Sequence, residues 1–303
     1  MRVAAIVTES FANEQMCLEL AAKHDLVGMF HPLDRPKSLG RSLDTFRRWR
    51  ISRGAAYVVL HKLAGRGPLL GWSRNQGLAA AEARHFARFH DEYQRTVAPK
   101  ARQVEDVNGP VFVEQIRHLD ADVVVCSGGP VYRAPLIRAA KLMLNYHTGI
   151  SPIYNGSDTN LWAYVNGHPQ LCGGTLMVIG EAVDGGDILA HHFCGVVPGD
   201  DPADVFCRAI AGGASLYNEF LADYEAGKPW RKIPQMKPFF YYRSLDWSLY
   251  QSLLAERMSA PAAKHKLSAA TETVRYWQSQ SDDDARRRLQ DELMKRMLVD
   301  EKV

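Results

Sequence analysis

The chain has 303 residues, of which 46% are hydrophobic and 23% are charged, and its formal net charge is +3. This is an ordinary globular balance with ample chain for a sizeable core, and the length predicts two domains, or one domain with an extension. No apolar run reaches the roughly 18 residues that a membrane-spanning helix needs, so neither a membrane protein nor a membrane partner is expected.

The N-terminus and the cysteines both indicate a cytoplasmic protein. Residues 1–10 contain one Arg and a short apolar run, without the length or the cleavage pattern of a signal peptide. The five cysteines are an odd number, and none has C-x-x-C spacing, which argues against a disulfide framework and a structural zinc site. We therefore expect a reducing compartment and no metal.

Positive charge is concentrated in residues 41–103, which carry thirteen Lys and Arg against four Asp and Glu. The preferred interpretation is a set of solvated helical faces. The alternative is a field that attracts an anionic ligand, either a small molecule such as a nucleotide diphosphate or an RNA. The Arg-rich run from Arg47 to Arg53 has no accompanying RNA-binding module, so we do not expect a nucleic-acid partner.

The first part of the chain predicts the start of an open parallel sheet. Strands are expected at Val3–Val7 and Leu26–Phe30, because both are short apolar runs, and the pattern between them at Phe11–Lys23 is helical. A strand, a helix and a strand in this order are typical of an α/β fold with a parallel sheet. No G-x-G-x-x-G follows the first strand, so a dinucleotide fingerprint is absent.

A helical insertion is predicted next, at about residues 40–98. Residues 40–66 and 76–98 are polar and rich in Arg, and both predict helices, separated by a turn signal at 65–68. Such a stretch is longer than the usual connection between a strand and a helix.

The remaining elements complete the predicted fold. Strands are predicted at 101–105, 122–126, 142–147, 174–179 and 187–196. Helices are predicted at 110–118, 133–141, 201–227, 245–258 and 282–298. We expect an open Rossmann-like, mostly parallel sheet with helices on both faces, the helical insertion, and a mostly helical C-terminal extension. The expected main domain is 1–227 and the extension is 228–303.

Three polar side chains lie at the ends of apolar strands. Asn145 and His147 are two residues apart at the end of one strand, and Asp184 follows the next strand in a Gly-rich turn. Asn145 can donate hydrogen bonds to a developing oxyanion, His147 can give or take a proton, and Asp184 can orient the His or accept a proton. Each residue alone is more often structural. As a set they predict direct acyl transfer without a covalent enzyme intermediate.

The order of motifs around these residues is specific. The motifs are Asn145-Tyr146-His147, Ser151-Pro152-x-Tyr154-x-Gly156, Trp162, Asn166-Gly167, Gly173-x-Thr175 and Val183-Asp184-Gly185-Gly186-Asp187. This set resembles the formyltransferases that use 10-formyltetrahydrofolate, which include glycinamide ribonucleotide transformylase, methionyl-tRNA formyltransferase and the formyltransferases of nucleotide-linked amino sugars. The resemblance covers residues 1–10 and about 100–227.

The resemblance implies a role for each catalytic residue. Asn145 would bind the formyl oxygen as it becomes an oxyanion. His147, protonated, would stabilise that charge and pass a proton to the departing folate nitrogen. Asp184 would hold His147 charged and help to remove a proton from the attacking amine through water, so that transfer proceeds by direct attack and a tetrahedral intermediate.

The resemblance also implies two binding regions. The 10-formyltetrahydrofolate donor would be bound by a loop after the strand 122–126 and by the turn that leads to Asp184. These residues are Cys126, Ser127, Gly128, Gly129, Pro130, Val131 and Tyr132, with Ile179, Gly180, Glu181, Ala182 and Val183. The amine acceptor would be bound near the loop 149–160 by Gly149, Ile150, Ser151, Tyr154, Asn155 and Thr175.

The acceptor is left open by the sequence, because the loop after His147 departs from the family pattern His-Pro-Ser-Leu-Leu-Pro and Asn155 replaces a usual basic residue. The preferred expectation is a primary amine of a small molecule, such as a nucleotide-linked amino sugar or a biosynthetic intermediate. One alternative is methionyl-tRNA, but residues 259–303 read as helical and nearly neutral. The other is a formyl-folate hydrolase or a non-catalytic folate-binding protein. We further expect a homodimer through the C-terminal helices.

Overall fold

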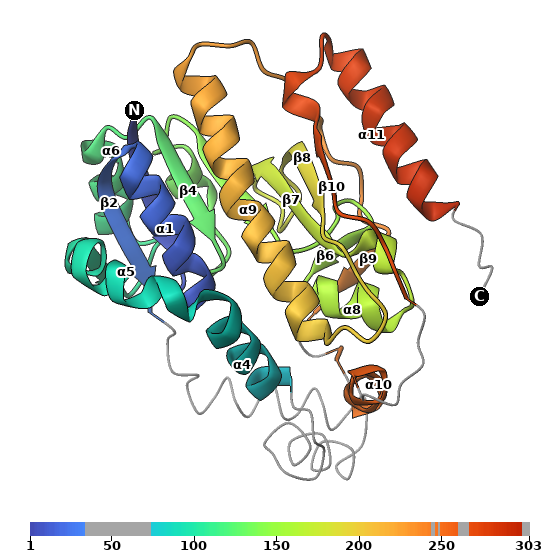
Figure 1. The fold of residues 1–303 in the computed structure, drawn as a ribbon. Helices are drawn as coiled ribbons and strands as arrows, with labels where there is room; N and C mark the ends of the chain where they lie inside the picture. The colour runs from blue at the N-terminus through green and yellow to red at the C-terminus, as the bar shows by residue number, and fades with distance from the viewer. Residues whose placement is uncertain (34–73, 244–245, 248, 260–266, 299–303) are drawn as a thin grey trace, which may run out of the picture.

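The computed structural model describes residues 1–33, 74–243, 246–247, 249–259 and 267–298 (Figure 1). An eight-stranded sheet runs through these residues in the order β10-β8-β7-β5-β4-β1-β2-β3. Its strands are β1 (Arg2–Val7), β2 (Asp25–Pro32), β3 (Ala101–Val104), β4 (Val123–Ser127), β5 (Met143–His147), β7 (Gly173–Val178), β8 (Asp187–Phe193) and β10 (Glu272–Arg275). A second sheet pairs β6 (Tyr154–Gly156) with β9 (Phe240–Tyr242).

The central sheet has a parallel part and an antiparallel part. From β3 to β5 every neighbouring pair is parallel, whereas β5, β7, β8 and β10 pair antiparallel. The carboxyl ends of β1, β4 and β5 therefore meet at one edge, where open α/β sheets bind ligands. The predicted Rossmann-like, mostly parallel architecture is confirmed.

Helices cover both faces of the sheet. The α-helices of the described residues are α1 (Phe11–Lys23), α4 (Arg74–Phe86), α5 (His90–Thr96), α6 (Pro110–Leu119), α7 (Ala134–Ile137), α8 (Thr159–Val165), α9 (Pro202–Glu225), α10 (Leu249–Ser259) and α11 (Asp282–Met297). Side chains alternate along β1, so Val3 and Ala5 join the core under α1 and α9, while Ala4 and Ile6 join the core under α6. Figure 1 shows α1 and α9 side by side on one face.

The described residues confirm most of the predicted elements. The helical pattern at 76–98 is present as α4 and α5, while the pattern at 40–66 lies outside the described residues. The helix predicted at 133–141 is wrong in length, because α7 has four residues and the chain then turns into β5 at Met143. No described helix has the length and the apolar character that crossing a bilayer requires.

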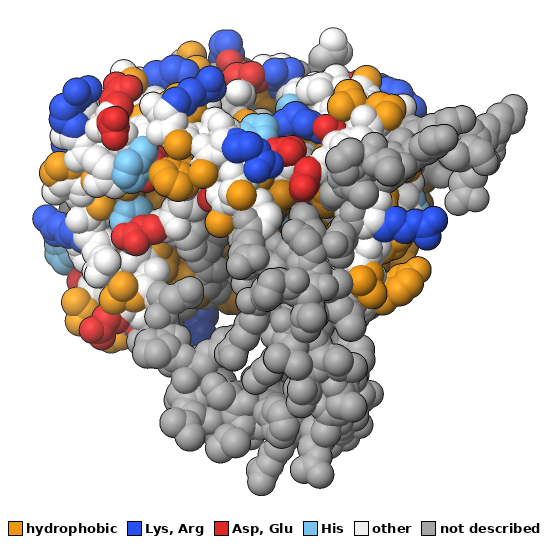
Figure 2. Space-filling view, turned by 60° about the horizontal axis from the view of Figure 1, so that its bottom comes forward, with side chains coloured by type: hydrophobic (Ala, Val, Ile, Leu, Met, Phe, Trp, Pro, Cys, Tyr) orange, Lys and Arg blue, Asp and Glu red, His pale blue; other side chains and the backbone are white. Residues whose placement is uncertain are grey.

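The concentration of positive charge falls largely on residues that the structure does not describe. Within the described part, Arg84 and His85 of α4 both lie 2.9 Å from Asp204 of α9. On the face shown in Figure 2, acidic and basic side chains are interspersed over the coloured surface. These described side chains fit the interpretation of solvated helical faces.

The C-terminal part packs onto the central sheet. β10 pairs antiparallel with β8, and α11 follows with its N-terminus capped by Ser281, whose hydroxyl accepts a hydrogen bond from the Asp284 amide at 3.1 Å. Arg296 of α11 is buried with its guanidinium 3.3 Å from the Phe193 ring centroid, and it donates to Glu292 and Glu272 at 2.6 Å each. No strand is predicted at β10 from the sequence.

A buried histidine on β8 makes the stability of the fold depend on pH. His191 is fully buried with its Nδ1 3.0 Å from the Tyr276 hydroxyl, and burial lowers its pKa from 6.5 to about 3. Between these values the unfolded chain binds a proton that the folded chain does not. We therefore expect full stability above pH 6.5 and a loss of about 1.4 kcal/mol per pH unit as the pH falls below it.

Urea unfolding of the wild type and His191→Gln between pH 8 and pH 5 checks this expectation. The free energy of unfolding should fall more steeply with decreasing pH in the wild type than in the variant, because glutamine does not titrate. Parallel curves for the two proteins would contradict it.

Candidate active site

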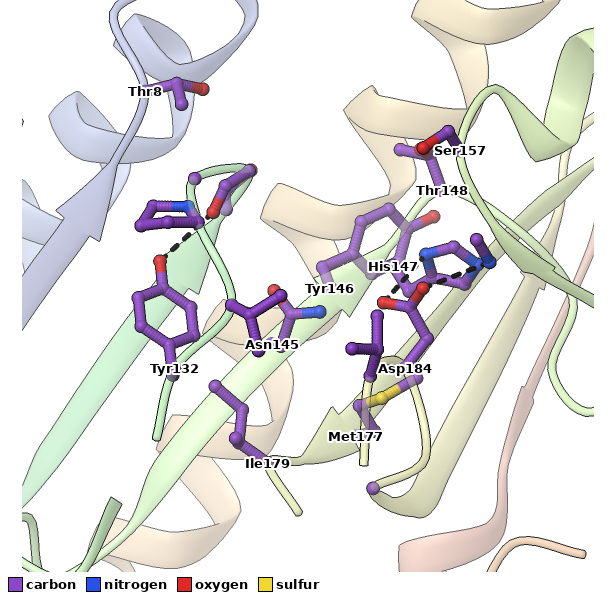
Figure 3. A pocket seen from close by; sticks show the side chains of 18 of the residues that line it. Thr8, Tyr132, Asn145, Tyr146, His147, Thr148, Ser157, Met177, Ile179 and Asp184 are labelled. Atoms are coloured by element: carbon purple, nitrogen blue, oxygen red, sulfur yellow. Dashed lines mark hydrogen bonds and ion pairs between the residues drawn. The ribbon is translucent and has the colours of Figure 1, made fainter. Parts of the chain in front are cut away.

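A pocket of about 530 Å³ opens at the edge of the sheet where β1, β4 and β5 end. Its wall includes Asn145, His147 and Asp184, which the sequence analysis selected together. Figure 3 shows Asn145 in the middle, with Tyr132 and its loop on one side and the His147–Asp184 pair on the other. The three residues are therefore brought into one cavity.

Asn145 and His147 face the same side of β5, because they are two residues apart on a strand. The residues between and before them, Tyr146 and Leu144, pack into the core under α9. The Tyr146 hydroxyl fixes this arrangement by donating to the Ala209 carbonyl of α9 at 2.6 Å. Within the described part of the chain the Asn145 amide has no hydrogen-bond partner, so its two N–H donors are available to a ligand.

His147 lies between two oxygen acceptors. Its Nδ1 is 3.5 Å from Asp184 Oδ1, and its Nε2 is 3.2 Å from the Tyr154 carbonyl oxygen. The His147 side chain is 7% exposed and the Asp184 side chain 17%. A protonated imidazole can donate to both acceptors at once, whereas a neutral ring can donate to only one of them. The geometry therefore suits a histidine that carries a proton for delivery.

Asp184 is held by its own turn and by β6. Its backbone has a φ of 49°, in the left-handed region, and it is followed by Gly185 and Gly186. The Gly156 amide donates to its Oδ2 at 3.0 Å, and the Asn155 side chain donates to its backbone carbonyl at 2.8 Å. One carboxylate oxygen is thus fixed by backbone, which leaves the other to face His147.

The loop after β4 forms the wall beside Asn145. Gly128 and Gly129 have φ values of +67° and +98°, and a Cβ on Gly128 would lie 2.6 Å from the Thr8 hydroxyl. Glycine is therefore required where this loop passes the end of β1. Tyr132 closes the loop by donating from its hydroxyl to the Gly128 carbonyl at 3.0 Å. Ser127, Pro130 and Val131 also line the pocket, as does the rest of this loop.

The turn between β7 and β8 forms another part of the pocket wall. Ile179, Gly180, Ala182 and Val183 line the pocket. Two residues predicted to bind the donor, Glu181 and Cys126, do not line it.

Glu181 points outward and pairs with Arg138 at 2.9 Å, and its side chain is 65% exposed. Cys126 is fully buried, and its carbonyl accepts a hydrogen bond from the Tyr217 hydroxyl of α9. Neither residue lines the pocket as described.

The residues predicted to bind the acceptor do not line the pocket as described. Gly149, Ile150, Ser151, Tyr154, Asn155 and Thr175 are buried. The Thr175 hydroxyl accepts from the Ser151 amide at 2.9 Å and donates to the Gly149 carbonyl at 2.6 Å. A Cβ on Gly149 would lie 2.6 Å from His147 Nε2. These residues therefore support the loop on which the His147 ring rests.

Other residues of the pocket were not selected from the sequence. Among them are Thr8, Ser10 and Asn13 at or just before the start of α1, Glu82 of α4, Ser157, and Tyr241 to Arg243 around β9. The position of Thr8 after β1 is a signal that strand-end reasoning offers. The β9 residues arrive through pairing with β6, more than 80 residues away along the chain, which no local pattern predicts. Among the described residues, no group of three or more His, Cys, Asp and Glu is arranged to hold a metal.

Comparison with known proteins gives a family match and similar solved structures. Residues 77–220 match the family model described as formyl transferase. Two methionyl-tRNA formyltransferases are similar in sequence: that of Myxococcus xanthus is 29% identical over 128 residues, and that of Solibacter usitatus is 32% identical over 127. The matches cover 42% and 41% of this chain, but only 40% of each relative.

Solved structures share the fold across most of the chain. A sugar N-formyltransferase from a Shewanella species aligns with a TM-score of 0.52 at 12% identity, covering 93% of this chain and 99% of that one. Glycinamide ribonucleotide transformylase 1 from Symbiobacterium toebii aligns with a TM-score of 0.50 at 17% identity, covering 78% of this chain and 94% of that one. At these identities the likeness concerns the fold.

Proposed function

We propose that the protein is an N-formyltransferase that moves the formyl group of 10-formyltetrahydrofolate to a primary amine of a small molecule. The observation that carries the proposal is the pocket in which the Asn145 amide, which has no hydrogen-bond partner among the described residues, lies beside the His147–Asp184 pair. The match of residues 77–220 to the formyl transferase family supports it.

The donor would bind between the loop after β4 and the turn after β7. Backbone groups of Ser127–Tyr132 and the apolar side chains of Ile179 and Val183 face the same cavity as Asn145. Backbone donors and acceptors on one side and apolar surface on the other suit a flat heteroaromatic ring. With the donor bound in this way, the formyl group would lie at the end of β5, in the part of the pocket that Asn145 and His147 line.

The reaction requires one bond to form and one to break at the formyl carbon. The acceptor nitrogen attacks that carbon, and the bond from the carbon to the folate nitrogen breaks. Asn145 donates hydrogen bonds to the formyl oxygen as it gains negative charge, which is the electrostatic role of an oxyanion hole. His147 gives a proton to the folate nitrogen, and Asp184 helps, through water, to accept the proton that the amine loses.

A small amine is preferred over tRNA because of how the C-terminal part is built. Among the described residues after 228, β10 extends the central sheet and α11 packs beside it, so this part adds to the same core. Of the solved neighbours of similar fold, the one from a Shewanella species is described as a sugar N-formyltransferase, and an N-formyltransferase from Helicobacter canadensis is described in complex with folinic acid and dTDP-3-aminofucose. Methionyl-tRNA is the second candidate acceptor, since the curated relatives of 29–32% identity are methionyl-tRNA formyltransferases.

An assay with defined acceptors tests the proposal. The protein is incubated with 10-formyltetrahydrofolate and, in separate reactions, a dTDP-linked amino sugar, glycinamide ribonucleotide, methionyl-tRNA or no amine. Tetrahydrofolate release is followed by absorbance and the N-formyl product by mass spectrometry. We expect release that depends on a small amine. Tetrahydrofolate release without an amine would indicate a hydrolase. Release only with methionyl-tRNA would indicate that methionyl-tRNA is the acceptor. No release with any of these acceptors would count against the proposal.

A further inference from the structure

The chain segment 233–242 crosses the site and is tied to it at both ends. At its start, Ile233 and Ile188 exchange backbone hydrogen bonds of 2.8 and 2.9 Å, which attaches the segment to the beginning of β8. At its end, β9 pairs in parallel with β6, in the stretch that follows His147. We call residues 233–242 the crossing segment. It joins the turn that carries Asp184 to the loop that supports His147.

Gln235 of the crossing segment contacts the Asp184 turn directly. Its Nε2 donates to the Asp184 carbonyl at 2.9 Å and to the Gly186 carbonyl at 3.2 Å. Its Oε1 accepts from the Asn155 Nδ2 at 2.7 Å, and that same Nδ2 donates to the Asp184 carbonyl at 2.8 Å. Two side-chain amides therefore converge on the backbone carbonyl of one catalytic candidate.

The Asp184 turn needs this support because its backbone conformation is uncommon. An aspartate in the left-handed region persists only where its surroundings hold it. The Gly156 amide anchors Oδ2, but it comes from β6, which is itself paired with the crossing segment. Both the backbone and the carboxylate of Asp184 thus depend on residues 233–242.

We propose that Gln235 is a positioning residue, which holds the Asp184 turn so that the carboxylate faces His147. Gln235 lies outside residues 77–220, the part that matches the family model. The expected effect of Gln235 on turnover rests on the proposed function, whereas its effect on the position of Asp184 does not. The experiment therefore has a structural readout and a kinetic readout.

The structural readout is the Gly156 amide proton in a two-dimensional amide NMR spectrum of the labelled full chain. We expect the 3.0 Å hydrogen bond to Asp184 Oδ2 to shift this proton downfield. In Gln235→Met, which keeps the side-chain length but loses the hydrogen bonds, we expect the resonance to move upfield or broaden. Gln278→Met is the matched control, because Gln278 donates to Asp223 at 2.8 Å on an exposed surface and does not line the pocket.

The kinetic readout is the split between kcat and KM. We expect Gln235→Met to lower kcat for tetrahydrofolate release by roughly tenfold, because a small misplacement of a reacting group is costly, with the donor KM within about twofold of wild type. Gln278→Met should keep both constants. The melting temperatures of both variants show whether a loss of activity merely follows from a loss of folding stability.

Gln235→Glu adds a test of the hydrogen bond itself. A glutamate carboxylate cannot donate to the Asp184 carbonyl, whereas the protonated acid can. The activity of this variant relative to wild type should rise as the pH falls from 8 towards 5, while the ratio for Gln235→Met stays flat.

Three results would overturn the inference: an unchanged Gly156 amide with wild-type kcat in Gln235→Met, a loss of activity that Gln278→Met reproduces, or a flat ratio for Gln235→Glu. A wild-type protein that transfers no formyl group would refute the proposed function alone, since the Gly156 resonance still reports whether Gln235 holds Asp184.

Discussion

Replacing Asp184 with asparagine should lower the rate of formyl transfer by on the order of 10³-fold, and His147→Ala should do the same. The physical reason is that a positioned proton donor or acceptor typically contributes between about 10² and 10⁴ in rate. Asparagine keeps the shape of the side chain and an oxygen for the Gly156 amide, but it removes the charge that faces His147 at 3.5 Å. Tetrahydrofolate release under saturating donor and acceptor measures the effect.

Asp187→Asn is the matched control for this prediction. Asp187 lies three residues after Asp184, at the first position of β8, where its carboxylate pairs with Lys232 at 2.7 Å, and it does not line the pocket. Its substitution should leave turnover near wild type, and melting temperatures should show that all three variants fold. Turnover near wild type in Asp184→Asn or His147→Ala would remove those residues from the mechanism.

Replacing Asn145 with alanine should lower kcat by about 10²- to 10³-fold, with little change in the KM of the donor. Loss of one oxyanion donor typically has this effect, because the hydrogen bond strengthens only as charge develops on the oxygen. The prediction is favoured by the absence of any hydrogen-bond partner for the Asn145 amide among the described residues. Steady-state kinetics with the acceptor that the assay identifies provides the measurement.

An isosteric variant separates the charge effect from the packing effect at this position. Asn145→Asp keeps the size of the side chain but turns an N–H donor into an anion that faces the developing negative charge. It should therefore be slower than Asn145→Ala. A faster Asn145→Asp, or an Asn145→Ala with wild-type kcat, would show that the amide does not bind the formyl oxygen.

The sequence predicts the catalytic candidates because each follows a strong local pattern. Apolar strands of the central sheet are easy to find, and Asn145, His147 and Asp184 come at or just after the ends of two of them. The glycines at 128 and 129 are also visible, since a turn after a buried strand needs positive φ there. These features depend on short stretches of chain, so composition and periodicity reveal them.

The supporting contacts depend on pairing over long distances, which local patterns do not encode. The strands β6 and β9 have three residues each, and their partners are about 86 residues apart in the chain. Gln235 lies in a stretch for which the sequence predicts neither a helix nor a strand. Only the structure shows that its side-chain amide contacts Asp184. The burial of Ser151, Tyr154 and Thr175 likewise follows from packing between the two sheets rather than from their own sequence.

The position of β10 has a consequence for how the protein is made. Residues 272–275 form the last strand of the sheet, yet they pair with β8, which ends at Phe193. While the chain emerges from the ribosome, this edge of β8 stays open until residues 272–275 have been synthesised, about 80 residues after β8 itself. Unpaired strand edges recruit other chains, and contacts distant in sequence form slowly. The nascent protein therefore has a long interval in which association with other chains competes with completion of its own sheet.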